Sequence, residues 1–324
     1  MTAVAGPVQG SIGMHQHVYA LAASPNFAVD GICFAAGDQG VYRSDDGGVT
    51  WNAALASLNL AEPLPATTVV LSPEFPTDQQ LFAGVPGGCL RSSDGSASWV
   101  ATVFPAPPPT ISQIVISPNV AVDKTVIAGT TADGMWRTTD GGADWYPWNF
   151  GLFDLHVVSL AVSPDFAQDQ TVFVGTETGL FRSTNGGRSW RELPLPAWCA
   201  PVISLAISPN IASDQTLFVG TEAHGLWRSH DGGMTWEQLA ADQIQGAVSN
   251  IVLIPEDPVK PHLLVVASNL LISRDGGTTW VLSGSPDIGA AEILAVAAPM
   301  GLHRGVPLLV ALESGGVQCI QITH

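Results

Sequence analysis

The chain has 324 residues, of which 46% are hydrophobic and only 12% charged, and its formal net charge is −17 at pH 7. Glycine and proline number 34 and 24, a composition typical of short strands joined by turns and not of long amphipathic helices. The excess of 28 Asp and Glu residues over 11 Lys and Arg residues excludes nucleic acid and an anionic membrane surface as electrostatic partners.

Residues 1–18 contain no basic segment followed by a long apolar run, so they do not resemble a secretory signal. No segment approaches the roughly 18 consecutive apolar residues of a membrane-spanning helix. We therefore expect a cytoplasmic protein without direct membrane insertion, with export after removal of a signal peptide as the alternative. The cysteines share no repeat position and form no CxxC pair, which predicts reduced, mostly buried thiols at Cys33, Cys89, Cys199 and Cys319.

An eight-residue phrase recurs along the chain and is clearest as SHDGGMTW. Its Asp-Gly and Gly-Gly steps favour the positive φ angles of a tight hairpin, and the Asp carboxylate can accept hydrogen bonds from amides of its own turn. The closing Trp begins the next strand and can bury a large area. The six copies are Ser44–Trp51, Ser92–Trp99, Thr138–Trp145, Ser183–Trp190, Ser229–Trp236 and Ser273–Trp280.

The closing tryptophans are separated by 48, 46, 45, 46 and 44 residues, a period that marks an array of one repeated unit. A second phrase, such as SPNIASD at Ser208–Asp214, precedes each of the first five copies, and its Pro and Asn predict a compact loop between two apolar runs. Each repeat thus predicts four short antiparallel strands, which make one blade of a β-propeller.

At this period the 324 residues predict an all-β fold of seven four-stranded blades. The last repeat has only three predicted strands and no box, so we expect residues 2–9 to supply its outer strand and close the ring. A six-bladed ring with a disordered tail is the alternative. The predicted blades span residues 17–56, 67–104, 111–149, 156–195, 201–240, 248–284, and 292–324 together with 2–9.

The pattern S-x-D-x-G-x-T-W resembles the Asp-box, or BNR repeat, of sialidase-like and sortilin-like β-propellers, and six copies in register make the resemblance specific. It implies that each box joins the third and fourth strands of a blade and is structural. More distantly, the repeat resembles the photosystem II assembly factors of the same shape, although the arginine patch of those factors is not visible here. The turn-forming residues are then Asp46, Asp94, Asp140, Asn185, Asp231 and Asp275.

An arginine precedes the box in five of the six copies, and Ile272 takes its place in the sixth. We interpret the arginines as scaffold residues that stack on a neighbouring Trp or pair with a loop aspartate such as Asp169. They are Arg43, Arg91, Arg137, Arg182 and Arg228.

The resemblance places the boxes and the Ser-Pro loops on one face of the ring. The opposite face carries the loops between second and third strands and the links between blades, and in sialidase-like propellers it binds the substrate. Those enzymes imply an arginine triad, a Tyr nucleophile and an F/Y-R-I-P phrase. The loops of this face contain no arginine, the phrase is missing, and Tyr19, Tyr42 and Tyr146 lie on or beside strands, so sialidase activity is disfavoured.

Carboxylates are nevertheless frequent on this face, and two of them across the axis could hydrolyse a glycoside. Glu177 and Glu222 are the candidate pair because they occupy equivalent positions in adjacent blades. Solvated loop charge is the simpler interpretation. The carboxylates of the face are Asp38, Glu62, Asp133, Asp154, Glu177, Glu222, Asp242, Asp287 and Glu313.

Aromatic residues on the links, including Phe150, could stack on sugar rings, form a protein-binding patch or cover the gap between blades. His15 and His17 lie two residues apart and could join His156 or His224 in a metal site, although scattered surface histidine is the simpler interpretation. We expect no metal and no cofactor. The ligand-binding candidates are Trp148, Phe153, His156, Trp198 and His224.

These patterns favour a non-enzymatic recognition or scaffold propeller that binds a protein or a glycan through the face opposite the boxes, either alone or within a larger assembly. A glycoside hydrolase with loop carboxylates at the central pocket is the alternative.

Overall fold

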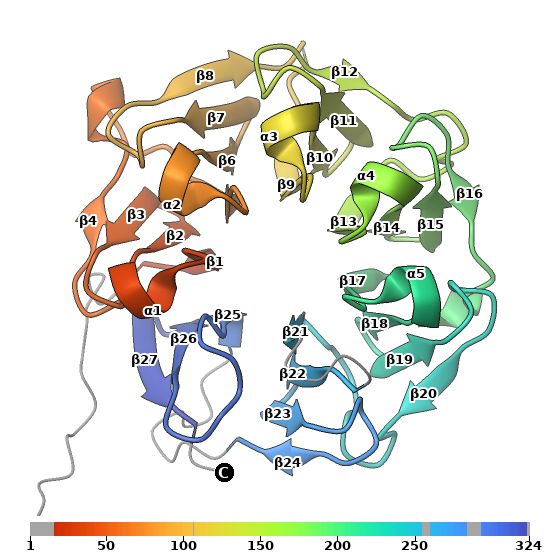
Figure 1. Cartoon of the computed structure of the whole chain (residues 1–324). Helices are drawn as coiled ribbons and strands as arrows, with labels where there is room; N and C mark the ends of the chain where they lie inside the picture. Colours follow the sequence, from red (N-terminus) through yellow and green to blue (C-terminus); the bar gives the residue numbers. More distant parts are fainter. Residues whose placement is uncertain (1–15, 106, 255–259, 284–292, 323–324) are drawn as a thin grey trace, which may run out of the picture.

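The computed structural model describes residues 16–105, 107–254, 260–283 and 293–322. Seven antiparallel sheets are arranged around a central axis as the blades of a propeller (Figure 1). Six sheets have four strands, and the seventh has three within the described residues. The predicted seven-bladed propeller is confirmed, and the six-bladed alternative is wrong.

In each blade the strands pair in sequence order from the axis outward. Blades 1 to 3 are β1 (Val18–Ala23), β2 (Cys33–Gly37), β3 (Gly40–Ser44) and β4 (Asn52–Ala53); β5 (Thr68–Leu71), β6 (Leu81–Val85), β7 (Gly88–Ser92) and β8 (Val100–Val103); and β9 (Ile111–Ile116), β10 (Val126–Thr130), β11 (Met135–Thr138) and β12 (Tyr146–Pro147). Blades 4 and 5 are β13 (Val157–Val162), β14 (Val172–Thr176), β15 (Leu180–Ser183) and β16 (Arg191–Glu192); and β17 (Val202–Ile207), β18 (Leu217–Thr221), β19 (Leu226–Ser229) and β20 (Glu237–Leu239). Blades 6 and 7 are β21 (Asn250–Ile254), β22 (His262–Val266), β23 (Leu270–Ser273) and β24 (Val281–Leu282); and β25 (Ile293–Ala297), β26 (Pro307–Leu312) and β27 (Val317–Gln321).

The Ser-Pro phrases form single helical turns between the first and second strands of blades 1 to 5. In the first copy Ser24 Oγ donates to Asp30 Oδ2 at 2.6 Å, and Asp30 Oδ1 accepts from the amide of Ile32 at 2.9 Å. The serine and the aspartate therefore clip the two ends of the turn together. The five turns are α1 (Phe27–Asp30), α2 (Phe75–Asp78), α3 (Val120–Asp123), α4 (Phe166–Asp169) and α5 (Ile211–Asp214). Among the described residues, no helix is long and apolar enough to cross a membrane.

The Asp-boxes are hairpin turns stabilised by their own side chains. Asp231 Oδ1 accepts from the amides of Met234 at 2.9 Å and Thr235 at 2.8 Å, and Asp231 Oδ2 accepts from Thr235 Oγ1 at 2.6 Å. In the copy with asparagine, Asn185 Oδ1 accepts from the amide of Ser189 at 3.0 Å, and Asn185 Nδ2 donates to Ser189 Oγ at 2.8 Å. The turn thus keeps its main contacts without a carboxylate.

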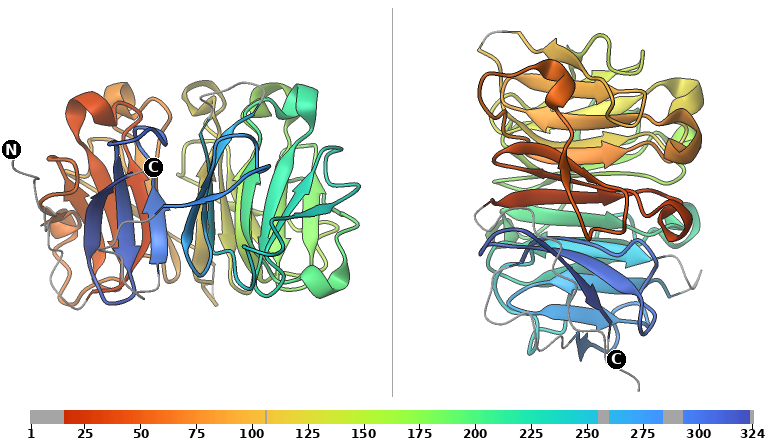
Figure 2. Two further views of the ribbon diagram at one scale, coloured as in Figure 1. Left: turned by 90° about the horizontal axis from the view of Figure 1, so that it is seen from below. Right: turned by 90° about the vertical axis from the view of Figure 1, so that its left-hand side faces the viewer.

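Box and helical turn lie on the same face of each blade. The amide of Gly47 donates to the carbonyl of Gly31 at 2.9 Å, and the amide of Gly232 donates to that of Gln215 at 3.0 Å. In the side views the five helices lie along one side of the ring (Figure 2). We call this side the box face and the opposite side the link face.

The hydrophobic core lies between the blades. The buried residues that the structure describes form seven apolar clusters, and each cluster joins two consecutive blades. One of them packs Val18 and Ala35 of blade 1 against Leu309 and Val317 of blade 7, so the first and last blades meet. The predicted closing strand, residues 2–9, lies outside the described residues.

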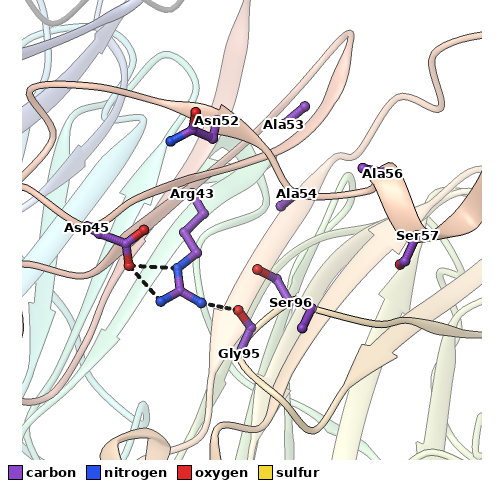
Figure 3. Close-up of a pocket in the computed structure, with 10 residues that line it drawn as sticks. Arg43, Asp45, Asn52, Ala53, Ala54, Ala56, Ser57, Gly95 and Ser96 are labelled. Atoms are coloured by element: carbon purple, nitrogen blue, oxygen red, sulfur yellow. Dashed lines mark hydrogen bonds and ion pairs between the residues drawn. The ribbon is translucent and has the colours of Figure 1, made fainter.

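The arginines before the boxes connect neighbouring blades. Arg137 Nη1 donates to the carbonyl of Gly186 in the next box at 2.5 Å, while its guanidinium carbon lies 4.6 Å from the ring centre of Trp148. Arg43 makes the same bond to Gly95 and is held by Asp45, with 2.6 Å between Nη2 and Oδ1 (Figure 3). The glycine is required because its φ is positive and a Cβ on Gly186 would lie 2.3 Å from Arg137 Nη1.

The other arginines follow the same rule. Arg91 Nη1 donates to Gly141 at 2.8 Å and Arg228 Nη1 to Gly276 at 2.6 Å, and Arg182 Nη1 lies 3.0 Å from the position of a Cβ on Gly232. The expected stacking on a tryptophan is present at Arg137. The expected pairing with Asp169 is wrong, because that carboxylate is used within its own turn by Ser163 and Thr171. We call the five arginines the struts.

Candidate binding face

The link face is built from two kinds of segment, which pack on one another. The first are the loops between the second and third strands of each blade, and the second are the links from an outer strand to the next inner strand. The link from blade 3 to blade 4 shows the arrangement: the amide and the hydroxyl of Thr178, in the loop of blade 4, donate to Asp154 Oδ2 at 2.9 and 2.8 Å. This link is therefore anchored to the loop of blade 4, the blade that it enters.

Asp154 is the buried carboxylate of this link, with 8% of its surface exposed. Its Oδ1 accepts from the amide of His156 at 3.0 Å and lies 3.1 Å from His156 Nδ1. Burial raises the pKa of Asp154, but the hydrogen bonds from His156 and Thr178 outweigh burial and lower the pKa to about 2. The carboxylate is thus ionised at neutral pH and serves to hold the link.

Phe153 precedes this anchor and is 85% exposed, although it is a large apolar side chain. Trp198 holds the corresponding place in the next link, where it is 56% exposed. Each lies four residues before the valine, Val157 or Val202, at which the inner strand begins. The two aromatic residues therefore occupy equivalent positions in adjacent links.

Trp198 lies in a short 3-10 turn, η2 (Ala197–Cys199), and packs edge-on against two other rings. Its ring centre lies 4.9 Å from that of His224 and 5.4 Å from that of Trp227. Trp227 Nε1 in turn donates to the carbonyl of His224 at 2.9 Å. The structure thus brings together two of the predicted ligand-binding residues, Trp198 and His224.

The other predicted site residues are placed separately. Trp148 packs between blades 3 and 4, because the guanidinium carbons of Arg137 and Arg188 lie 4.6 and 5.6 Å from its ring centre. Glu177 and Glu222 are exposed in the loops of blades 4 and 5.

His17 is exposed, whereas His15 and Asp287 lie outside the described residues. No group of three or more His, Cys, Asp or Glu side chains suited to a metal ion occurs in the part of the chain that the structure describes.

Cationic side chains are confined to one half of the ring. All eleven Lys and Arg residues lie in the half of the ring nearer the box face, which we call the box half. They are the five struts, Arg188 and Arg274 within boxes, Arg191 directly after a box, and Lys124, Lys260 and Arg304 between first and second strands. The described loops and links of the link face carry eight carboxylates and no Lys or Arg. The carboxylates are Asp38, Glu62, Asp133, Asp154, Glu177, Glu222, Asp242 and Glu313.

A hollow of about 370 Å³ lies on the link face where the link from blade 1 crosses to blade 2. Its wall combines the apolar side chains of Leu55, Leu60, Pro63 and Leu64 with the polar side chains of Gln39, Tyr42, Asn59 and Glu62. This hollow was not predicted from the sequence, because most of its lining residues belong to a link that does not repeat.

Comparison with known proteins places these features in a family. A model of the BNR/Asp-box repeat matches residues 42–53, and the model described as "Photosynthesis system II assembly factor YCF48" matches residues 120–258. Together with the six boxes and the seven blades, these matches show that the chain is an Asp-box (BNR) β-propeller. Among curated proteins, none matches the chain significantly.

Solved structures share the fold at low identity. YCF48 from Cyanidioschyzon merolae is 14% identical with a TM-score of 0.68, covering 96% of this chain and 97% of that chain. A structure of YCF48 bound to D1 peptide is 15% identical with a TM-score of 0.68, covering 96% and 93%.

An ancestral GH74 enzyme is 19% identical with a TM-score of 0.73, covering 98% of this chain and 46% of that chain. The GH74 enzyme of Niastella koreensis is 16% identical with a TM-score of 0.74, covering 98% and 54%. This chain therefore spans about half the length of the GH74 enzymes that it resembles.

Proposed function

We propose that this chain is a non-enzymatic binding propeller whose link face docks a protein partner. The observation that carries the proposal is the pair of exposed aromatic side chains, Phe153 and Trp198, at equivalent positions of adjacent links. Exposed aromatic residues on a rigid, hydrogen-bonded frame are typical anchors of protein interfaces. The structure of YCF48 with D1 peptide supports the proposal, because it shows that a propeller of this fold can bind a peptide.

The buried carboxylate of the link face lacks the property of a hydrolytic acid. A glycoside hydrolase uses one carboxyl group that is kept protonated as the general acid. The buried carboxylate of this face, Asp154, has its pKa lowered to about 2 because the hydrogen bonds from His156 and Thr178 outweigh the effect of burial. Asp154 is therefore suited to holding the link and not to donating a proton.

The proposal is tested by cross-linking in the native host, comparing wild type with the double variant Phe153→Ala/Trp198→Ala. We expect a partner that wild type cross-links and that the variant loses by about tenfold or more, because truncation of an interface anchor typically costs over 1 kcal/mol per residue. The matched control is Val29→Ala/Val122→Ala, which removes side chains that are 81% and 75% exposed on the box face.

Equal recovery of the same proteins by all three chains would contradict the proposal. Hydrolysis of xyloglucan by wild type, lost in Glu177→Gln/Glu222→Gln, would replace it with the glycoside hydrolase alternative.

A further inference from the structure

We propose that the link face binds an arginine-rich segment of a partner protein, with guanidinium groups stacked on Phe153 and Trp198 and paired with Glu177 and Glu222. This inference rests on the proposed function and adds the chemistry of the partner.

The division of charge is the first step. The eight carboxylates of the link face have no Lys or Arg among the described loops and links to balance them, whereas the box half holds all eleven cations of the chain. A face with one sign of charge attracts a segment of the opposite sign and speeds its association. The partner segment is therefore cationic.

The second step is the repeated placement of an aromatic residue beside a glutamate. Thr176 pairs with Val157, and Glu177 follows Thr176 in the loop on which the link of Phe153 is anchored. Thr221 pairs with Val202 in the same way, and the amide of Glu222 donates to the carbonyl of Pro201 at 3.2 Å. The ring of Trp198 contacts His224 of that same loop. Two adjacent blades thus present the same combination of ring and carboxylate.

The aromatic rings beside these carboxylates favour arginine over other cations. A guanidinium group is planar, stacks on an aromatic ring and pairs with a carboxylate at the same time, whereas a lysine ammonium is a strongly hydrated point charge. The chain stacks arginines on rings in its box half, where Arg137 lies 4.6 Å from the ring centre of Trp148, and it combines both contacts at Arg43, which lies 5.8 Å from the ring centre of Phe34 and pairs with Asp45. On the link face the rings and the glutamates are present, and the arginine is supplied by the partner.

Glu177 and Glu222 are available for such a contact. Both are exposed, and neither has an ion-pair partner among the residues that the structure describes. The remaining exposed carboxylates, Glu62, Asp242 and Glu313, extend the negative surface around the ring and would steer the segment without fixing its position.

The test uses three fluorescent peptides, four repeats each of Arg-Gly-Ser, Lys-Gly-Ser and Glu-Gly-Ser, with binding followed by anisotropy between 50 and 300 mM NaCl. We expect the arginine peptide to bind several-fold more tightly than the lysine peptide, the glutamate peptide not to bind, and the affinity to fall with salt. Glu177→Lys/Glu222→Lys and Phe153→Ala/Trp198→Ala should each weaken the arginine peptide by about tenfold.

The control is Glu74→Lys/Asp165→Lys, which makes the same change of net charge on the box face at two exposed residues whose side chains cap no helix. Its affinity should stay within about twofold of wild type, because these charges lie outside the proposed site. An equal loss in this control would overturn the site, and equal binding of the lysine and arginine peptides would overturn the stacking.

If the peptides do not bind while Phe153→Ala/Trp198→Ala still loses the cross-linked partner, this inference fails and the proposed function stands. If that variant also keeps the partner, both fail.

Discussion

The two faces of the ring are built from the same seven blades but follow opposite rules. On the box face the copies repeat their contacts: the aspartate or asparagine holds its own turn, and each of the five struts reaches the glycine of the next box, while Ile272 stands in place of a strut in the sixth copy. On the link face equivalent positions differ, since the place of Phe153 and Trp198, four residues before the inner strand, is taken by Pro107 in the link that leads to β9. The repeated contacts therefore stabilise the ring. The residues that differ between repeats give the links leading to blades 4 and 5 a distinct surface.

The strut contacts give the largest expected effect on stability. Arg137 is 9% exposed, donates to Gly186 and to Thr125 Oγ1, and packs on Trp148. We expect Arg137→Ala to lower the free energy of unfolding by about 3 kcal/mol, because it removes charged hydrogen bonds together with the packing of the side chain. Urea denaturation followed by tryptophan fluorescence measures this difference.

Arg191→Ala is the control, since Arg191 is an exposed arginine on the outer strand β16. Its change should stay within about 0.5 kcal/mol. Similar losses in the two variants would show that the bond between blades contributes no more than an arginine on the surface.

On the link face we expect the largest loss of stability when Asp154 is substituted. We expect Asp154→Asn to lower the free energy of unfolding at pH 7 by about 2 kcal/mol, because an amide meets the donors of Thr178 and His156 less well than a carboxylate does. The pKa of Asp154 is lowered to about 2 in the folded state, as its hydrogen bonds outweigh burial, so its contribution is complete above the unfolded pKa near 4 and is lost as pH falls toward 2. The difference between wild type and variant should therefore shrink in urea titrations between pH 4 and pH 2.

Asp38→Asn provides the comparison at another carboxylate of the same face. Among the residues that the structure describes, Asp38 Oδ1 is buried and has no hydrogen-bond partner, so this oxygen loses no bond in the amide variant. A pH dependence that is unchanged in Asp154→Asn would contradict the role given to its carboxylate.

The sequence predicted the propeller fold more completely than it predicted the contacts of the link face. The box fixes a hairpin through contacts within eight residues, and the inner strands Val18–Ala23 and Val202–Ile207 begin and end where their apolar runs do. The Ser-Pro phrases, predicted as compact loops, contain single helical turns.

The link face depends instead on contacts between segments far apart in the chain. The bond between Asp154 and Thr178 spans 24 residues, and nothing in the link sequence marks Asp154 as buried. The exposure of Trp198 could be suspected from its place on a link, but its contact with His224 required the loop of the following blade.

The box of blade 2 departs from the glycine pattern, and substitutions there are expected to have the smallest effect on stability. Ser96 replaces the second glycine of the box in blade 2, and its φ is +79°. In blade 5 the same position is Gly233, where a Cβ would lie 2.6 Å from Leu193 of blade 4. Blade 1 has Ala54 in the place of Leu193, so Ser96 fits, and a hollow of about 200 Å³ remains beside Arg43 (Figure 3). Ser96 is therefore tolerated because Ala54 leaves room for its Cβ, and both residues line the hollow.

We expect Ser96→Gly alone to raise the free energy of unfolding by about 1 kcal/mol through relief of the left-handed backbone. Ala54→Leu alone should destabilise the protein, because the added side chain meets the Cβ of Ser96, whereas the double variant should regain the packing of Leu193 against Gly233 and exceed Ser96→Gly. A double-mutant cycle by urea denaturation measures this coupling. Additive effects would mean that the hollow is independent of the pair, and binding to the link face should be the same in all four chains because the substitutions leave its aromatic residues and glutamates in place.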